Sequence, residues 1–232
     1  MKAFERIYVA LDTTDVDYAV ELASKLKGLV GGMKVGKQFF TANGPQGVER
    51  ITAVGMPVFL DLKFHDIPNT VAGAIRAAGR TNCAIVNVHA QGGPAMLRAA
   101  AEAAREVAIP MAIAVTILTA LDEDDLHAVG IPGTVENQVV RLAKLTQDNG
   151  MDGVVCSAKE IAPIRKACGP DFKLIVPGIR PQWAAAGDQK RIMTPSDAVK
   201  AGADILVIGR PITQADDPVA AAKLIAEELE GL

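Results

Sequence analysis

The sequence predicts a single-domain (β/α)8 (TIM) barrel, chiefly because two kinds of segment alternate along it. Short β-branched apolar runs alternate with longer Ala-rich stretches of helical character, and about eight such units fit into the 232 residues. The apolar runs are continuous, as in Ile-Tyr-Val-Ala-Leu, which is typical of parallel strands covered on both faces. A doubly wound open sheet is the alternative, but no GxGxxG motif follows the first strand.

Each element is assigned from its own residues, the strands from Val- and Ile-rich runs and the helices from Ala-rich periodic segments. The expected strands are Ile7–Leu11, Gly32–Val35, Val58–Lys63, Ala84–His89, Met111–Thr116, Gly153–Cys156, Leu174–Pro177 and Ile205–Gly209. The expected helices are Val16–Lys27, Thr70–Arg80, Ala95–Val107, Val135–Asn149, Ala158–Ala167 and Ala220–Glu230. Asp12-Thr-Thr-Asp15 is a helix-capping pattern. No linker or shift in composition divides the chain, so residues 1–232 are expected to form one domain.

Charge and hydropathy argue against two classes of protein. The net charge of −3, the pI near 5.7 and the lack of a basic run argue against a nucleic-acid surface. The longest uncharged apolar stretch, residues 108–121, is too short to span a bilayer and contains Pro110. The amino terminus runs directly into a strand without a signal peptide. We therefore expect a cytoplasmic metabolic protein that binds neither nucleic acid nor membrane.

The three cysteines, Cys83, Cys156 and Cys168, form neither a CxxC pair nor a metal-ligand spacing. Their odd number and their apolar or helical neighbours favour buried free thiols. Free thiols suit a reducing compartment.

The most informative feature is a set of charges in the third expected strand. Because alternate strand residues point the same way, Asp61 and Lys63 share one face, opposite Leu62 and Phe64. Asp66 follows where the strand ends. Such charges are costly to bury unless they are paired, so this array is either a structural ion-pair cluster or a reaction site.

Other strand ends of the predicted barrel also carry polar residues, and reaction sites of these barrels lie at that face. Asp12 ends the first strand, although it could simply cap the next helix. Lys34 lies within the apolar second strand, where its ammonium group requires a partner, and Asp61 and Asp66 are the candidates. Thr119 follows the fifth strand.

Metal and nucleophile chemistry have weaker support in the sequence. His65 and His89 fit structural or supporting roles better than metal ligation, and no His, Asp or Glu cluster has convincing metal spacing. No serine or cysteine nucleophile with a paired base is apparent. We expect no metal and no cofactor.

The last two strands indicate a phosphate site. Gly178 and Gly209 allow close approach of the backbone, Arg180 and Arg210 supply charge, and barrels often hold phosphate after strands seven and eight. The polar segment between Arg180 and Met193 could close over the phosphate and bring Gln189 to it. A phosphorylated small-molecule substrate is therefore expected.

These residues together resemble orotidine 5′-phosphate decarboxylases of the short bacterial type, over essentially the whole chain. The motifs that carry the resemblance are Asp61-Leu-Lys63-Phe-His-Asp66-Ile-Pro-Asn-Thr70, Val115-Thr-Ile-Leu-Thr119, Pro177-Gly-Ile-Arg180 and Ile208-Gly-Arg210. Related Mg²⁺-dependent sugar-phosphate enzymes share the DxKxxD array. They typically carry an acidic residue near the end of strand two, where this chain has Lys34.

The resemblance implies a catalytic charge array and a set of substrate contacts. The array would consist of Asp61, Lys63 and Asp66. Asp12 and Lys34 would hold the ribose hydroxyls, and Thr119 would lie against the pyrimidine. The remaining substrate-binding positions are Pro177, Arg180, Gln189, Gly209 and Arg210, of which the last four would bind the phosphate.

The resemblance also implies a homodimer with shared active sites, because Asp66, Ile67 and Thr70 would reach into the neighbouring subunit's site. The expected activity is cofactor-free conversion of orotidine 5′-monophosphate to UMP and CO2 in pyrimidine biosynthesis, with Lys63 protonating C6. The alternatives are a Mg²⁺-dependent sugar-phosphate decarboxylase or aldolase, and a non-catalytic phosphometabolite-binding barrel.

Overall fold

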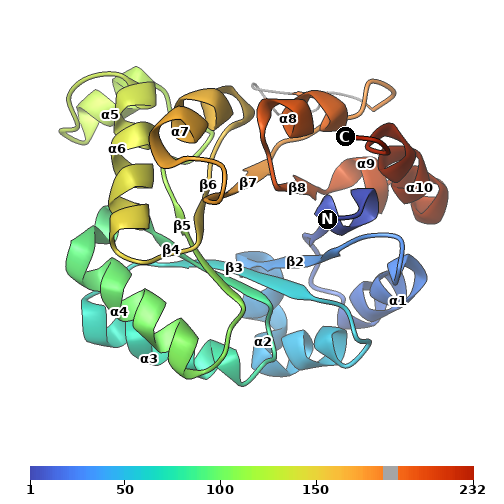
Figure 1. Cartoon of the computed structure of the whole chain (residues 1–232). Helices are drawn as coiled ribbons and strands as arrows, with labels where there is room; N and C mark the ends of the chain where they lie inside the picture. The colour runs from blue at the N-terminus through green and yellow to red at the C-terminus, as the bar shows by residue number, and fades with distance from the viewer. Residues whose placement is uncertain (185–192) are drawn as a thin grey trace.

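The computed structural model describes residues 1–184 and 193–232. Within them, parallel strands pair in chain order and close into a barrel, with helices around the outside (Figure 1). The strands are β1 Ile7–Leu11, β2 Gly32–Gly36, β3 Val58–Phe64, β4 Ile85–His89, β5 Met111–Val115, β6 Gly153–Val155, β7 Lys173–Pro177 and β8 Ile205–Ile208. The predicted (β/α)8 barrel is confirmed, and each predicted strand is present to within one residue at either end.

Four helices lie outside the ranges given above from the sequence pattern, which are α2, α5, α8 and α9. The α-helices are α1 Val16–Leu26, α2 Lys37–Thr52, α3 Pro68–Gly79, α4 Gly93–Glu106, α5 Glu123–Ala128, α6 Val135–Asp148, α7 Ile161–Cys168, α8 Pro195–Ala201, α9 Arg210–Thr213 and α10 Pro218–Glu228. Short 3₁₀ turns cover Ala3–Arg6, Ala90–Gly92 and Ala158–Glu160. The predicted helix Ala158–Ala167 is therefore a 3₁₀ turn followed by α7.

The missed helices have local causes. In α2, Gly44 takes a left-handed φ of 62° and Pro45 follows it, so the helix is kinked and its apolar period is broken. α5, α8 and α9 are short, and their apolar periodicity spans too few residues to stand out from a loop.

Side-chain caps fix where several helices begin. The carboxylate of Asp15 accepts a hydrogen bond from the Tyr18 amide at 3.0 Å, so Asp15, and not Asp12, caps α1. Thr134 and Asp217 cap α6 and α10 in the same way. Asp12 is thereby left available for the site at the carboxyl ends of the strands.

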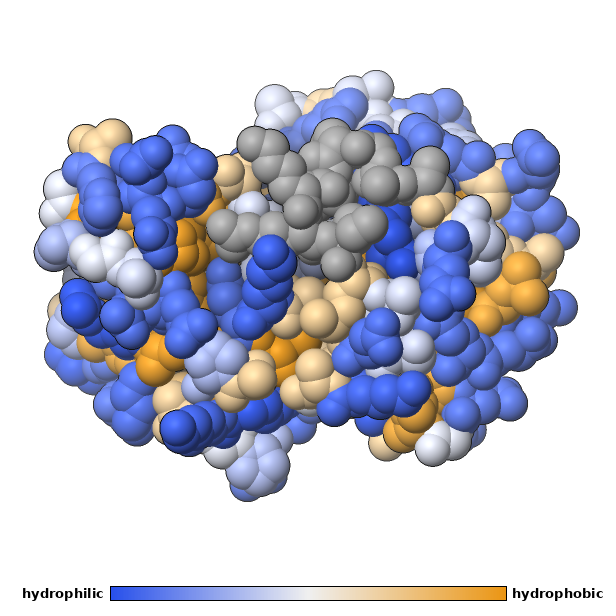
Figure 2. All heavy atoms as spheres, turned by 90° about the horizontal axis from the view of Figure 1, so that it is seen from above, coloured by the Kyte–Doolittle hydropathy of each residue, from blue (hydrophilic) through white to orange (hydrophobic). Residues whose placement is uncertain are grey.

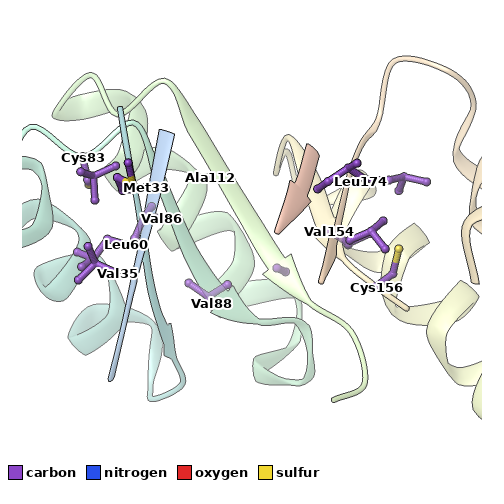
Figure 3. Packing of buried hydrophobic residues seen from close by; sticks show 14 of the residues in the cluster. Met33, Val35, Leu60, Cys83, Val86, Val88, Ala112, Val154, Cys156 and Leu174 are labelled. Carbon is purple, nitrogen blue, oxygen red and sulfur yellow. The ribbon is translucent and has the colours of Figure 1, made fainter. Parts of the chain in front are cut away.

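Two apolar layers hold the barrel together. The larger layer lies between strands and helices, and Figure 3 shows Met33, Val35 and Leu60 gathered on one side of the barrel wall. The smaller layer fills the lower barrel interior with Tyr8, Ala10, Phe59, Ile85, Ile113, Ile175, Ile205 and Val207. This interior is a packed core rather than a channel, as expected for a barrel of this kind.

Along the strands, the inward-facing residues change from apolar to polar toward the carboxyl ends. Phe59 is followed two residues later by Asp61, and Ile85 by Asn87, both on the inward face. The buried apolar layer thus forms the floor beneath the polar residues near the carboxyl ends of the strands.

The outer surface and the cysteines can be compared with the sequence expectations. Hydrophilic residues predominate on the face shown in Figure 2. Among the described residues, no helix is long and apolar enough to cross a membrane. All three cysteines are free thiols, but Cys168 is half-buried, so the expectation that all three are buried is wrong for this residue.

Candidate active site

A cavity of about 740 Å³ opens at the carboxyl ends of the strands. It is lined by most of the residues that the sequence singled out, namely Asp12, Lys34, Asp61, Lys63, Thr119, Pro177, Arg180, Gly209 and Arg210. Apolar side chains from the barrel wall, such as Phe59, Val155 and Val207, complete the lining. The cavity therefore combines a dense set of charges with an apolar floor.

At the base of the cavity, four charged side chains form a chain of close contacts. Nζ of Lys63 lies 2.5 Å from Oδ1 of Asp61, and Nζ of Lys34 lies 3.4 Å from Oδ2 of the same carboxylate. Lys34 also lies 3.5 Å from the more exposed Asp12. One buried carboxylate thus holds two ammonium groups, one on β2 and one on β3.

Asp61 remains an anion although it is buried. Burial by itself would raise its pKa, but the charges of Lys34 and Lys63 and the hydrogen bonds from Lys63 and Asn87 act in the opposite direction. Their combined effect places the pKa of Asp61 below its ordinary value. At neutral pH the site therefore contains a fixed negative charge between two amines.

Lys63 reaches this position through an irregular stretch of β3. Its φ is +55°, in the left-handed region that residues with a side chain seldom adopt. The register between β3 and β4 shifts between Leu60 and Phe64, so the strand pairing is interrupted where Lys63 lies. Asp61 and Lys63 do share a face as predicted, but simple strand alternation is not the full reason.

Among the described residues Asp66 forms no ion pair, contrary to the expectation that it could compensate Lys34. It is exposed, and its carboxylate accepts a hydrogen bond from the Ile67 amide at 2.6 Å. Ile67 is 67% exposed, Thr70 is also exposed, and none of the three residues lines the cavity. The partners of Lys34 are Asp61 and Asp12 instead.

The other end of the cavity carries the predicted phosphate-binding residues. Arg180 is buried, and its backbone amide donates to the carbonyl of Met193 at 3.1 Å, joining the two ends of the intervening segment. Gly178 has a φ of +76°, which favours glycine at this turn. Arg210 begins α9, directly after Gly209. Gln189 lies outside the described residues.

The structure adds two residues that sequence reasoning missed. Asn87 is fully buried and contacts both Asp61 and Lys63. Tyr18 lines the cavity, and its hydroxyl donates to the carbonyl of Thr213 at 3.1 Å, which ties α1 to α9. A polar residue within the apolar run Ala-Ile-Val-Asn-Val was a usable signal for Asn87, because buried amides need partners. Tyr18 gave no such signal.

The two histidines beside the charge array lie close together. The ring centroids of His65 and His89 are 5.5 Å apart. Burial, followed by the positive charges of His65, Lys37 and Lys63, lowers the pKa of His89 from 6.5 to about 4. His89 is therefore neutral at neutral pH. In the described part of the chain, no group of three His, Cys, Asp or Glu residues is placed to hold a metal ion.

Comparison with known proteins identifies the family. The family model described as "Orotidine 5'-phosphate decarboxylase / HUMPS family" matches residues 5–225. The chain belongs to this family. It is 54% identical to the orotidine 5′-phosphate decarboxylase of Paramagnetospirillum magneticum, with 96% of this chain and 97% of the relative covered. It is likewise 54% identical to that of Rhodospirillum rubrum, over 97% of this chain and 94% of the relative.

Solved structures of the family have the same barrel. The orotidine 5′-phosphate decarboxylase of Lactobacillus acidophilus superposes with a TM-score of 0.87 at 34% identity, covering 97% of this chain and 99% of that one. The structure from Pyrococcus horikoshii gives a TM-score of 0.79 at 26% identity, with 97% of this chain and all of that one covered. The resemblance inferred from the motifs and the barrel fold are thus confirmed.

Proposed function

We propose that this chain decarboxylates orotidine 5′-monophosphate to UMP and CO2, a step of pyrimidine biosynthesis. The observation that carries the proposal is the buried Lys34–Asp61–Lys63 array at the base of a cavity, in a chain 54% identical to decarboxylases of that name. A binding module has little reason to maintain such an array, because buried charges cost free energy unless they are paired. The array therefore favours catalysis over simple binding.

The proposed chemistry takes place at C6 of the pyrimidine. The bond from C6 to the carboxylate breaks heterolytically, CO2 leaves, and the electron pair stays on C6. The ammonium group of Lys63 stabilises this charge and then transfers a proton to C6, after which the neutral amine takes up a proton from water. The reaction as proposed requires neither a metal nor an organic cofactor.

Asp61 is proposed to lie against the carboxylate of the substrate. Two such charges about 4 Å apart repel by roughly 4 kcal/mol at an effective dielectric constant near 20, and the repulsion disappears as CO2 departs. We assign the larger effect to Lys63, because a charge oriented in advance acts directly on the transition state. The 2.5 Å contact between Lys63 and Asp61 supports such prior orientation.

The rest of the substrate is proposed to occupy the remainder of the cavity. Asp12 and Lys34 would hold the ribose hydroxyls, and Thr119 would lie against the pyrimidine. Pro177 would contact the substrate at the end of β7. The phosphate would lie near the loops after β7 and β8, at Arg180, Gln189, Gly209 and Arg210. Binding of a phosphate far from C6 would then contribute to the rate through closure of the site.

An ultraviolet assay that follows the loss of orotidylate absorbance tests the proposed function directly. We expect turnover by the purified chain, with the same rate in excess EDTA. Activity on orotidine 5′-monophosphate that persists in excess EDTA would exclude the Mg²⁺-dependent sugar-phosphate alternative. Binding of the nucleotide without turnover would indicate a phosphometabolite-binding barrel.

We further propose that two copies of this chain share their active sites. Asp66, Ile67 and Thr70 lie outside the cavity of their own chain, and the large apolar side chain of Ile67 is 67% exposed. An exposed residue of this kind beside a charge array suits a contact with a second copy. In the dimer, Asp66 would complete the array of the neighbouring subunit.

Mixing two inactive variants tests the shared site. Lys63→Ala and Asp66→Asn should each lose activity as pure proteins. After mixing and subunit exchange, about half of the dimers are hybrids with one intact site each, so about a quarter of the wild-type activity should return. A lack of recovery in mixtures shown to contain hybrid dimers would exclude sharing of these two residues.

We also propose that all 232 residues fold as one domain in the cytoplasm. The three free thiols support a reducing compartment. A single cooperative unfolding transition and recovery of the activity in the cytosolic fraction are expected. A two-step transition or an extracytoplasmic activity would contradict these assignments.

A further inference from the structure

Asn87 on β4 is the buried neighbour of both proposed catalytic side chains, and the reaction outlined above gives it no task. Its side chain is fully buried. The amide nitrogen Nδ2 donates to Oδ1 of Asp61 at 2.7 Å, and the amide oxygen Oδ1 accepts from the backbone N–H of Lys63 at 2.8 Å. One side chain thus contacts the carboxylate of the array and the backbone that carries its ammonium group.

Both contacts require the same orientation of the amide. A carboxylate accepts hydrogen bonds only, and a backbone N–H only donates, so the NH2 group must face Asp61 and the oxygen must face Lys63. Rotating the amide by 180° would place its NH2 group against the Lys63 N–H, which is also a donor. It would place the amide oxygen against the Asp61 carboxylate, which is also an acceptor. Asn87 is therefore held in one orientation and does not adapt to its surroundings.

The contact with Lys63 stands where the strand pairing fails. Leu60 pairs with Val86 and Phe64 with Val88, so four steps along β3 correspond to two along β4. Asn87 lies opposite this interruption. Its side-chain oxygen accepts the hydrogen bond of the Lys63 backbone N–H, in place of a backbone carbonyl of the neighbouring strand. It accepts from the residue whose φ of +55° is unusual for a lysine.

We propose that Asn87 is a positioning residue that fixes the direction of the Lys63 ammonium group relative to the Asp61 carboxylate. This inference rests on the proposed decarboxylation. By holding the Lys63 backbone in its left-handed conformation and one oxygen of Asp61 in place, Asn87 keeps donor and carboxylate aligned before the substrate binds. Small misplacements of a catalytic group lower the rate of the chemical step strongly, whereas phosphate and ribose contacts stay unchanged.

Replacement by alanine tests the positioning role. In Asn87→Ala we expect kcat to fall roughly 10- to 100-fold, the effect of losing hydrogen bonds to charged or functional groups, with KM little changed. Asn149→Ala is the matched control, because the Asn149 amide also donates at 2.7 Å (to the Leu145 carbonyl) and accepts at 2.7 Å (from Arg98), but outside the cavity lining. It should lose stability and keep its kcat. A kcat for Asn87→Ala within about twofold of the control overturns the proposal.

Asn87→Asp gives a second test that an ordinary structural role does not predict. The new carboxyl would lie among Asp61 and Lys63 on β3, Lys34 on β2 and His89 on β4. When protonated it can donate to Asp61 and accept from the Lys63 amide, as asparagine does. When ionised it repels Asp61. Relative to wild type at each pH, its kcat should rise as the pH falls, while Asn87→Ala keeps a constant deficit. Parallel profiles for the two variants would argue against the role.

Hydrogen exchange separates this inference from the proposed function. In Asn87→Ala, exchange of the Lys63 amide hydrogen should become at least about tenfold faster, and in Asn149→Ala it should not change. A wild-type protein that lacks decarboxylase activity would refute the proposed function, and the exchange experiment would still report whether Asn87 holds Lys63. Unchanged protection of that amide in Asn87→Ala would refute the positioning itself.

Discussion

Replacing Lys63 with alanine removes the ammonium group that lies 2.5 Å from Oδ1 of Asp61. A cation at a contact distance of about 4 Å stabilises a developing carbanion by roughly 4 kcal/mol at an effective dielectric constant near 20, or about a thousandfold in rate. Loss of the proton donor typically adds a factor of about 10²–10⁴. We therefore expect decarboxylation by Lys63→Ala to fall by at least about 10⁵-fold.

The same variant should remain folded. Asp61 keeps Lys34 at 3.4 Å and the amide of Asn87 at 2.7 Å, so its charge retains partners. Leaving a buried charge alone costs about 3–5 kcal/mol, and we expect a smaller loss here, about 1–3 kcal/mol. Binding of a product nucleotide should persist, because the phosphate residues are unchanged.

Three measurements test this prediction. The ultraviolet assay gives the decarboxylation rate, titration calorimetry with UMP gives nucleotide binding, and thermal unfolding gives the stability. Lys144→Ala is a matched control, because Lys144 also lies 2.5 Å from an aspartate, Asp148, but is 51% exposed. It should lose little stability and no activity, because an exposed ion pair is screened by solvent. Near-normal decarboxylation by Lys63→Ala would remove Lys63 from its proposed role. Loss of UMP binding together with turnover would mean that the site had collapsed.

Two further predictions concern the phosphate and the histidine pair. Arg210→Ala should lose roughly 10- to 100-fold in kcat/KM with orotidine 5′-monophosphate and little with the unphosphorylated nucleoside; equal losses for both substrates would contradict the phosphate assignment. His89 has a pKa lowered from 6.5 to about 4, so the unfolded chain binds this proton at a higher pH than the folded protein does. The free energy of unfolding should therefore fall as the pH drops from 6.5 to about 4, and His89→Gln should flatten this dependence. Urea unfolding at several pH values measures the free energy of unfolding. The same pH dependence in wild type and His89→Gln would refute the assignment of this effect to His89.

The sequence predicted the barrel and the site to different extents. The strands could be predicted because apolar, mostly β-branched residues dominate them, and a strand that is buried on both faces has little choice of residues. The kinked helix α2 could not, since Gly44 and Pro45 interrupt the period on which such predictions depend. The placement of Asp12, Lys34 and Arg210 followed from the rule that strand ends form the site.

The sequence by itself determined the fold class, the family and the identity of the charged residues, because those depend on local composition and on motifs. Only the tertiary structure decided which charges meet. It pairs Lys34 with Asp61 and Asp12 rather than with Asp66, and it inserts Asn87 between Asp61 and the Lys63 backbone. The reason is that contacts across β2, β3 and β4 depend on strand register, and the register shifts at Lys63 through a backbone irregularity that residue types alone do not reveal.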